Sequence, residues 1–61
     1  MHLLRSIEIC LRRTGIPPTR FGREAVRDPR FVLDLRNGRT PRPAMERRVR
    51  AYLNQIEQET R

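Results

Sequence analysis

The sequence predicts a small all-α protein of four helices. Apolar residues recur with the 3.6-residue period of a helix, no stretch shows the two-residue alternation of a half-buried strand, and glycine and proline divide the chain into four segments. A chain of 61 residues has room for one domain with a thin core. We therefore expect a single four-helix domain over residues 1–61, too small for the layered architectures that surround a deep pocket.

The first two helices are predicted from their apolar stripes and their end signals. The first spans 3–13 and is ended by Gly15. The second opens at one of the two prolines at 17–18, because proline is accepted in the first helical turn, and runs to Val26. Gly22 inside it costs about 1 kcal/mol relative to alanine, which indicates that another helix packs against its backbone. The residues expected to face the core are Leu3, Leu4, Ile7, Cys10, Leu11, Phe21, Ala25 and Val26.

Asp28 and Pro29 mark the start of the third helix. Aspartate is a common N-cap and proline fits the first helical position, so this helix is expected over 29–37, closed by Gly38. The side predicted to be buried consists of Phe31, Val32 and Leu35. The opposite side, at helical spacing, consists of Arg30, Leu33, Asp34 and Asn37.

A basic connector over 39–43 with two prolines precedes the fourth helix, which is expected from Ala44 to about Gln58. One narrow stripe of that helix serves the core and consists of Met45, Val49, Tyr52 and Ile56. Leu53 lies at the edge of this stripe. Because so short a chain has little apolar area to bury by itself, we expect a homodimer with Leu53 as its contact.

Charge is the strongest indication of function. The chain has 14 basic residues, all of them arginine, against 7 acidic ones, for a net charge of +7. Such a field attracts polyanions, nucleic acid first and an anionic membrane surface second. A membrane-surface role is the weaker of the two, because the basic residues are spread over several short helices and do not line one long amphipathic face.

Residues that carry catalysis or bind metals are scarce. His2 is the sole histidine, and Cys10, the sole cysteine, lies on the apolar stripe of the first helix, where a core role is expected. The carboxylates are scattered beside arginines, and no glycine-rich phosphate loop is present. We therefore predict no enzyme activity, no metal site and no cofactor. With no apolar stretch long enough for a signal peptide or a membrane span, the expected location is cytoplasmic and nucleoid-associated, in a bacterium or phage.

The order of the middle elements predicts a helix-turn-helix: two short helices joined by a tight link, with apolar residues where that unit needs them. The stretch from Thr19-Arg20-Phe21-Gly22 to Leu35-Arg36-Asn37-Gly38-Arg39 resembles the lambda-repressor-like, Cro-type DNA-binding domains, and the resemblance covers residues 3–56. The family usually has a glycine in the turn at 26–28, where this chain has Val26 and Arg27.

The resemblance implies that the helix at 29–37 faces the major groove of DNA. Four side chains would then reach base edges: Pro29, Arg30, Leu33 and Asp34. Arg30 is the candidate for a forked contact with guanine O6 and N7. Leu33 either contacts a thymine methyl group or is an ordinary exposed leucine. Asp34 either accepts a hydrogen bond from a cytosine amino group or orients Arg30 one turn earlier, and we expect the second.

Phosphate contacts are expected around that helix. Asn37 matches a phosphate-contacting position of the family, Arg39 and Arg42 stand on the connector, and Arg20 and Arg23 lie near the start of the preceding helix.

Taken together, the sequence predicts a regulator of transcription, with repression as the expected role, that binds double-stranded DNA. A small basic adaptor that binds another protein, for example of the transcription machinery, is the first alternative; the exposed Leu33 and Ile9 are compatible with it. An RNA-binding module is the second alternative, and few aromatic residues are left exposed for it to stack bases.

Overall fold

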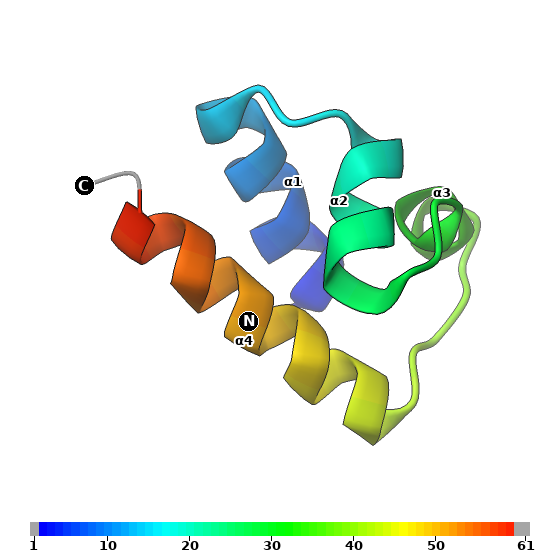
Figure 1. Cartoon of the computed structure of the whole chain (residues 1–61). Helices are drawn as coiled ribbons and strands as arrows, with labels where there is room; N and C mark the ends of the chain where they lie inside the picture. The colour runs from blue at the N-terminus through cyan, green and yellow to red at the C-terminus, as the bar shows by residue number, and fades with distance from the viewer. Residues whose placement is uncertain (1, 60–61) are drawn as a thin grey trace.

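The computed structural model describes residues 2–59, which form four helices and no strand (Figure 1). The helices are α1 (Leu3–Thr14), α2 (Pro18–Val26), α3 (Phe31–Arg36) and α4 (Pro43–Glu59). The long α4 runs beneath α1 and α2, and α3 lies at the side of the molecule away from the C-terminal end of α4 (Figure 1). The all-α class is thereby confirmed for the described part of the chain.

One apolar core lies between the four helices. The two phenylalanines of the chain, Phe21 in α2 and Phe31 in α3, are completely buried at its centre. Cys10 is buried and unpaired, as expected for a small core residue, whereas Ile9 is 42% exposed on the outer side of α1. The buried residues are Leu3, Ile7, Cys10, Leu11, Phe21, Ala25, Val26, Phe31, Val32, Leu35, Val49, Leu53 and Ile56.

The third helix is shorter than predicted. Instead of spanning 29–37, α3 covers six residues, Phe31–Arg36, and Pro29 and Arg30 form a turn ahead of it. The reason is that Asp28 closes this turn: its Oδ1 accepts a hydrogen bond from the Arg30 N–H at 3.0 Å, and its carbonyl accepts one from the Phe31 N–H at 3.1 Å. The predicted helix start was therefore two residues early.

The prediction that Leu53 is a dimer contact is wrong. Its side chain is 8% exposed and belongs to the core, while Met45 and Tyr52, which the sequence predicts in the core stripe, are only partly buried. The physical reason is that α4 packs against both α1 and α2. The buried stripe of α4 is therefore broader than that of a helix with one neighbour, and it includes Leu53. Too little of the Leu53 side chain is exposed for it to contact a second protomer.

Leu53→Ala should lower the free energy of unfolding by about 2–4 kcal/mol, because the truncation leaves a cavity between α4 and its neighbours. Urea unfolding followed by circular dichroism measures this loss. Ile9→Ala removes a similar apolar volume from an exposed site and should change stability by less than about 0.5 kcal/mol. Equal losses for the two variants would contradict the placement of Leu53 in the core.

Candidate functional site

One face of α3 and its flanks points to solvent. Arg30, Leu33 and Asn37 are exposed and Asp34 is partly exposed, whereas Phe31, Val32 and Leu35 on the opposite side are buried. Leu33 is 41% exposed, a high value for a large apolar side chain in so small a protein. The predicted division of α3 into a core side and a solvent side is therefore confirmed.

Gly22 sets how closely α2 approaches the turn before α3. A Cβ atom on Gly22 would overlap the carbonyl oxygen of Asp28 and lie 3.2 Å from Cβ of Phe31. The Gly22 carbonyl in turn accepts a hydrogen bond from the Asp28 N–H at 3.1 Å. The sequence predicted that another helix packs against this glycine; in the structure the turn makes the closest contact, and of α3 only its first residue, Phe31, lies beside it.

The turn itself is made without glycine. Arg27 ends α2 in the left-handed conformation, with φ of 58° and ψ of 32°, and its N–H donates to the Arg23 carbonyl at 2.9 Å. A residue with a Cβ atom is strained there by about 1–2 kcal/mol. Position 27 therefore has the left-handed backbone conformation that glycine usually adopts, although the residue there is an exposed arginine.

The polar side of α2 is tied to α4. The ring of Phe21 meets that of Tyr52 edge to face with centroids 5.3 Å apart, and the Tyr52 hydroxyl donates to Oε2 of Glu24 at 2.6 Å. Burial of the phenol and this hydrogen bond raise the pKa of Tyr52 to about 12. The other oxygen of Glu24 accepts from Nε of Arg20 at 3.3 Å, so the predicted phosphate ligand Arg20 already has a carboxylate partner.

The end of α3 is tied to α1 by a forked ion pair. Nε and Nη2 of Arg36 donate to the two carboxylate oxygens of Glu8 at 2.8 and 2.7 Å. The hydrogen bonds from Arg36 are the main reason why the pKa of Glu8 lies below its ordinary value of 4.5. Both side chains are partly exposed, so water screens the pair and its contribution to stability is small.

Arg39 pairs with two carboxylates at the exposed side of α3. Its Nη1 lies 3.1 Å from Oδ2 of Asp34 and 3.5 Å from Oδ2 of Asp28. The expectation that Asp34 orients Arg30 is therefore wrong. The backbone explains why: the Arg39 N–H donates to the Asp34 carbonyl at 3.0 Å, which brings the start of the connector back beside the helix.

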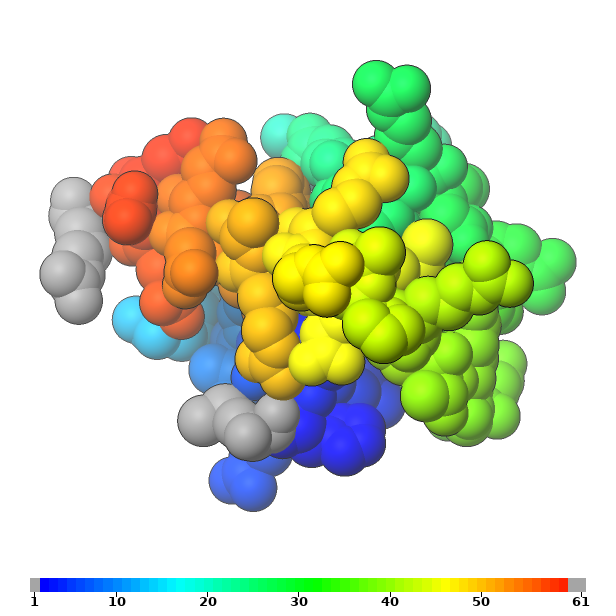
Figure 2. Space-filling model, turned by 90° about the horizontal axis from the view of Figure 1, so that it is seen from below, coloured from blue at the N-terminus to red at the C-terminus, as the bar shows by residue number. Residues whose placement is uncertain are grey.

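A basic groove adjoins this cluster. It has a volume of about 500 Å³ and lies between the connector and the first turns of α4; its lining residues are Arg39, Thr40, Arg42, Ala44, Met45 and Arg48. Figure 2 shows the connector and the start of α4, in yellow-green and yellow, next to green α3. Arg48 lines this groove from α4, although the sequence did not single it out. Arg48 follows Ala44 by about one helical turn, so the two residues lie on the same side of α4. This spacing is the feature of the sequence that could have indicated its place beside the connector.

Several predicted site arginines lack an acidic partner. Arg23, Arg30 and Arg42 are exposed and make no ion pair with any residue in the range 2–59. Pro29 is exposed beside Arg30. All four predicted base-contacting residues are thus at least partly exposed on α3 or the turn before it; Arg39 contacts Asp34, and Arg39 and Arg42 line one groove.

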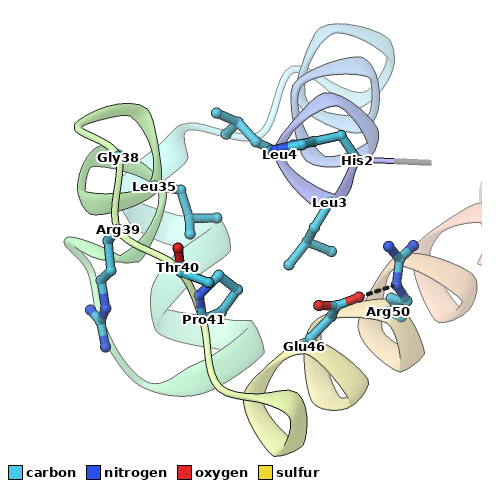
Figure 3. Close-up of a pocket in the computed structure, with 10 residues that line it drawn as sticks. All are labelled: His2, Leu3, Leu4, Leu35, Gly38, Arg39, Thr40, Pro41, Glu46 and Arg50. Atoms are coloured by element: carbon cyan, nitrogen blue, oxygen red, sulfur yellow. Dashed lines mark hydrogen bonds and ion pairs between the residues drawn. The ribbon is translucent and has the colours of Figure 1, made fainter.

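A second hollow, of about 380 Å³, lies on the other side of the connector (Figure 3). Leu3 of α1 and Leu35 of α3 point into it, and Arg39 extends away from it. Its edge on α4 is an ion pair between Glu46 and Arg50, with Nε of Arg50 3.0 Å from Oε2 of Glu46. The leucines make this lining a continuation of the core, and its polar side chains are His2, Arg39, Thr40 and the paired Glu46 and Arg50.

The described residues contain no group of three or more His, Cys, Asp or Glu side chains placed to hold a metal ion. None of the four helices is long and apolar enough to cross a lipid bilayer. Comparisons with protein families, with characterised proteins and with solved structures found no match for this chain. Evidence on function therefore comes from the surface around α3.

Arg27→Gly should raise the free energy of unfolding by about 0.5–1 kcal/mol, because relief of the left-handed strain exceeds the entropy that glycine loses on folding. Arg23→Gly removes the same side chain from the right-handed interior of α2 and should instead cost about 1 kcal/mol. Thermal unfolding of both variants measures the difference. A loss of stability in Arg27→Gly would contradict the strained turn.

The Glu8–Arg36 pair should stabilise the fold at neutral pH and stop doing so in acid. Because the folded-state pKa of Glu8 is depressed, its contribution is complete above the unfolded-state value of 4.5 and is lost as the pH falls through the folded-state value. We expect Glu8→Gln to melt at a lower temperature than the wild type at pH 7. Near pH 2–3, roughly two units below the ordinary carboxylate pKa, the two proteins should melt together.

Arg36→Gln should behave in the same way, and the double variant should add no further loss at pH 7. A difference between wild type and Glu8→Gln that persists unchanged in acid would show that the carboxylate charge does not contribute.

Proposed function

We propose that this protein binds double-stranded DNA as a helix-turn-helix regulator of transcription in which α2 and α3 form the binding unit. The observation that carries the proposal is the exposed face of α3. Leu33 in this helix and Arg30 just before it are exposed to solvent, while the other side of the helix is buried in the core. A helix held in this way can enter the major groove, where base edges can be read.

The distribution of charge supports a nucleic-acid partner. Five of the carboxylates, Glu8, Glu24, Asp28, Asp34 and Glu46, are each in an ion pair with an arginine. Arginines without such a pair remain at Arg23, Arg30 and Arg42. Because the chain as a whole carries +7, this excess provides the attraction that phosphate requires.

The basic groove beside the connector is the proposed seat of the DNA backbone. Arg42 and Arg48 line it from two elements, and Arg39 joins them at the end nearest α3. Asn37 is exposed at the end of α3, where phosphates flanking the groove would pass. Arg20 and Arg23 would contact phosphate from α2, Arg20 with a weaker effect because Glu24 already shares its charge.

The aromatic residues favour duplex DNA over single-stranded RNA. Phe21 and Phe31 are fully buried, and Tyr52 is partly buried with its hydroxyl bound to Glu24. The two phenylalanine rings are closed to bases and the tyrosine ring is only partly accessible, whereas single-stranded RNA readers depend on exposed stacking surfaces. An adaptor that binds another protein is the second candidate, and the exposed Ile9 and Leu33 are the observations that favour it.

Selection of binding sites from a random duplex library with the purified chain tests the proposal. An enriched motif would support sequence-specific binding, and a near-palindromic one would indicate that two copies bind together. Absence of enrichment, with tight co-purification of a protein, would favour the adaptor. Repression or activation can then be read from a reporter gene that carries the selected site.

Two arginines should separate base reading from backbone contact. Arg30→Ala should cost about 1–3 kcal/mol on the selected site and relax the preference at one or two base pairs, with a small effect on random DNA. Arg42→Ala should weaken binding to all duplexes equally and reduce the slope of log K against log salt by about one unit. Fluorescence anisotropy titrations over a range of salt measure both. Equal losses on both duplexes for Arg30→Ala would make it a phosphate contact.

A further inference from the structure

We propose that Asp34 is a specificity-determining residue that acts mainly by penalising the wrong DNA, and that Arg39 is the residue that positions its carboxylate. This inference rests on the proposed DNA-binding function and deepens it, because it names a chemical group that a favourable site must present: an amino group on a base edge in the major groove.

The supporting observation is the charge balance of the Arg39 cluster. One guanidinium lies between the carboxylates of Asp28 and Asp34, at 3.5 and 3.1 Å, so the three side chains together carry −1. They are partly exposed, with side-chain exposures between 32% and 43%. The cluster is thus a negative spot, open to solvent, on the same side of the molecule as the arginines of the proposed interface.

A negative spot opposes binding that depends on phosphate alone. Two unit charges of like sign repel each other over the distances of an interface, and the repulsion increases when water is displaced. If charge attraction were the purpose of this surface, asparagine at position 34 would serve it better. On binding DNA the carboxylate loses its bound water. A hydrogen-bond donor on the DNA compensates for this loss, whereas a site without a donor leaves the acceptor unsatisfied and weakens binding.

The geometry leaves Asp34 able to accept such a donor. Arg39 occupies Oδ2, while Oδ1 accepts no hydrogen bond from residues 2–59. In the major groove the donors are the amino groups of cytosine and adenine, whereas the O6 and N7 atoms of guanine are acceptors and would repel it. Arg30, one turn earlier on the same face, has the opposite requirement and suits guanine.

Arg39 controls where this acceptor stands. Its backbone N–H donates to the Asp34 carbonyl at 3.0 Å and its side chain reaches the carboxylate of the same residue, so the connector holds Asp34 at two points. The link to Asp28 fixes the guanidinium against the turn. Arg39 therefore acts through Asp34, in addition to any contact of its own with phosphate.

The test compares Asp34→Asn with Glu59→Gln. Both remove one negative charge with little change of shape, but Glu59 lies at the C-terminal end of α4, away from α3 (Figure 1). Affinities are measured at one salt concentration for a random duplex and for the site that selection identifies. Circular dichroism melting shows that each variant is folded.

We expect Asp34→Asn to bind random duplex roughly threefold to tenfold more tightly than the wild type, as removal of one repulsive charge at an interface predicts. The selected site should gain less or lose affinity, so the ratio of specific to random binding should fall. Glu59→Gln should change either affinity by less than about twofold. Similar effects of Asp34→Asn and Glu59→Gln would overturn the proposal.

Arg39→Ala gives a second readout. It should weaken binding to both duplexes, since two carboxylates are then uncompensated, and adding Asp34→Asn should restore part of the loss. The ratio of specific to random binding should fall in Arg39→Ala, but Arg39→Ala should not lower it further in the Asp34→Asn background; an equal fall in both backgrounds would overturn the positioning role of Arg39. A wild-type chain that binds no duplex at any salt concentration would overturn the proposed function as well, whereas salt-dependent binding with an unchanged ratio in Asp34→Asn would overturn the specificity role alone.

Discussion

The close approach of the Asp28 carbonyl to Gly22 is the constraint on which the rest of the structure depends. It lets the turn after α2 fold back over the helix, and the hydrogen bond between the Asp28 N–H and the Gly22 carbonyl closes that turn. A side chain at position 22 would move the turn away. Phe31, which lies against the same glycine, could not then bury its ring, and α3 would lose the contact that orients its exposed face.

A six-residue helix does not persist in water by itself, because nucleation costs more than so few hydrogen bonds return. The surroundings maintain α3. Three apolar side chains anchor it in the core, and polar ties lie at both ends: Asp28 closes the turn that leads into it, and Arg36 reaches Glu8 on α1. The same ties that make the helix stable also determine which side of it remains open.

The charges have two distinct uses in this small protein. Carboxylates on α1, α2, α3 and α4 hold arginines in defined places, as Glu8 holds Arg36 and Glu24 holds Arg20. The remaining arginines supply an attraction that acts at long range and is screened by salt. Arg39 stands between these roles, because it is fixed by two carboxylates and also lines the basic groove. Its environment is therefore what gives the proposed interface a local negative charge.

Most of the fold followed from the sequence because local rules determine it. Helical periodicity and the proline and glycine signals located α1, α2 and α4 to within one or two residues, and the small residue at position 22 indicated a close helix approach.

Tertiary structure decided the rest. Periodicity shows which way Leu53 points but not how many neighbours α4 has, and two neighbours bury that residue. The partner of Asp34 could not be read from helical spacing either, because Arg39 reaches it only after the connector folds back onto α3. Likewise, nothing in the local sequence required Arg27 to be left-handed; the packing of the turn against Gly22 imposes that conformation.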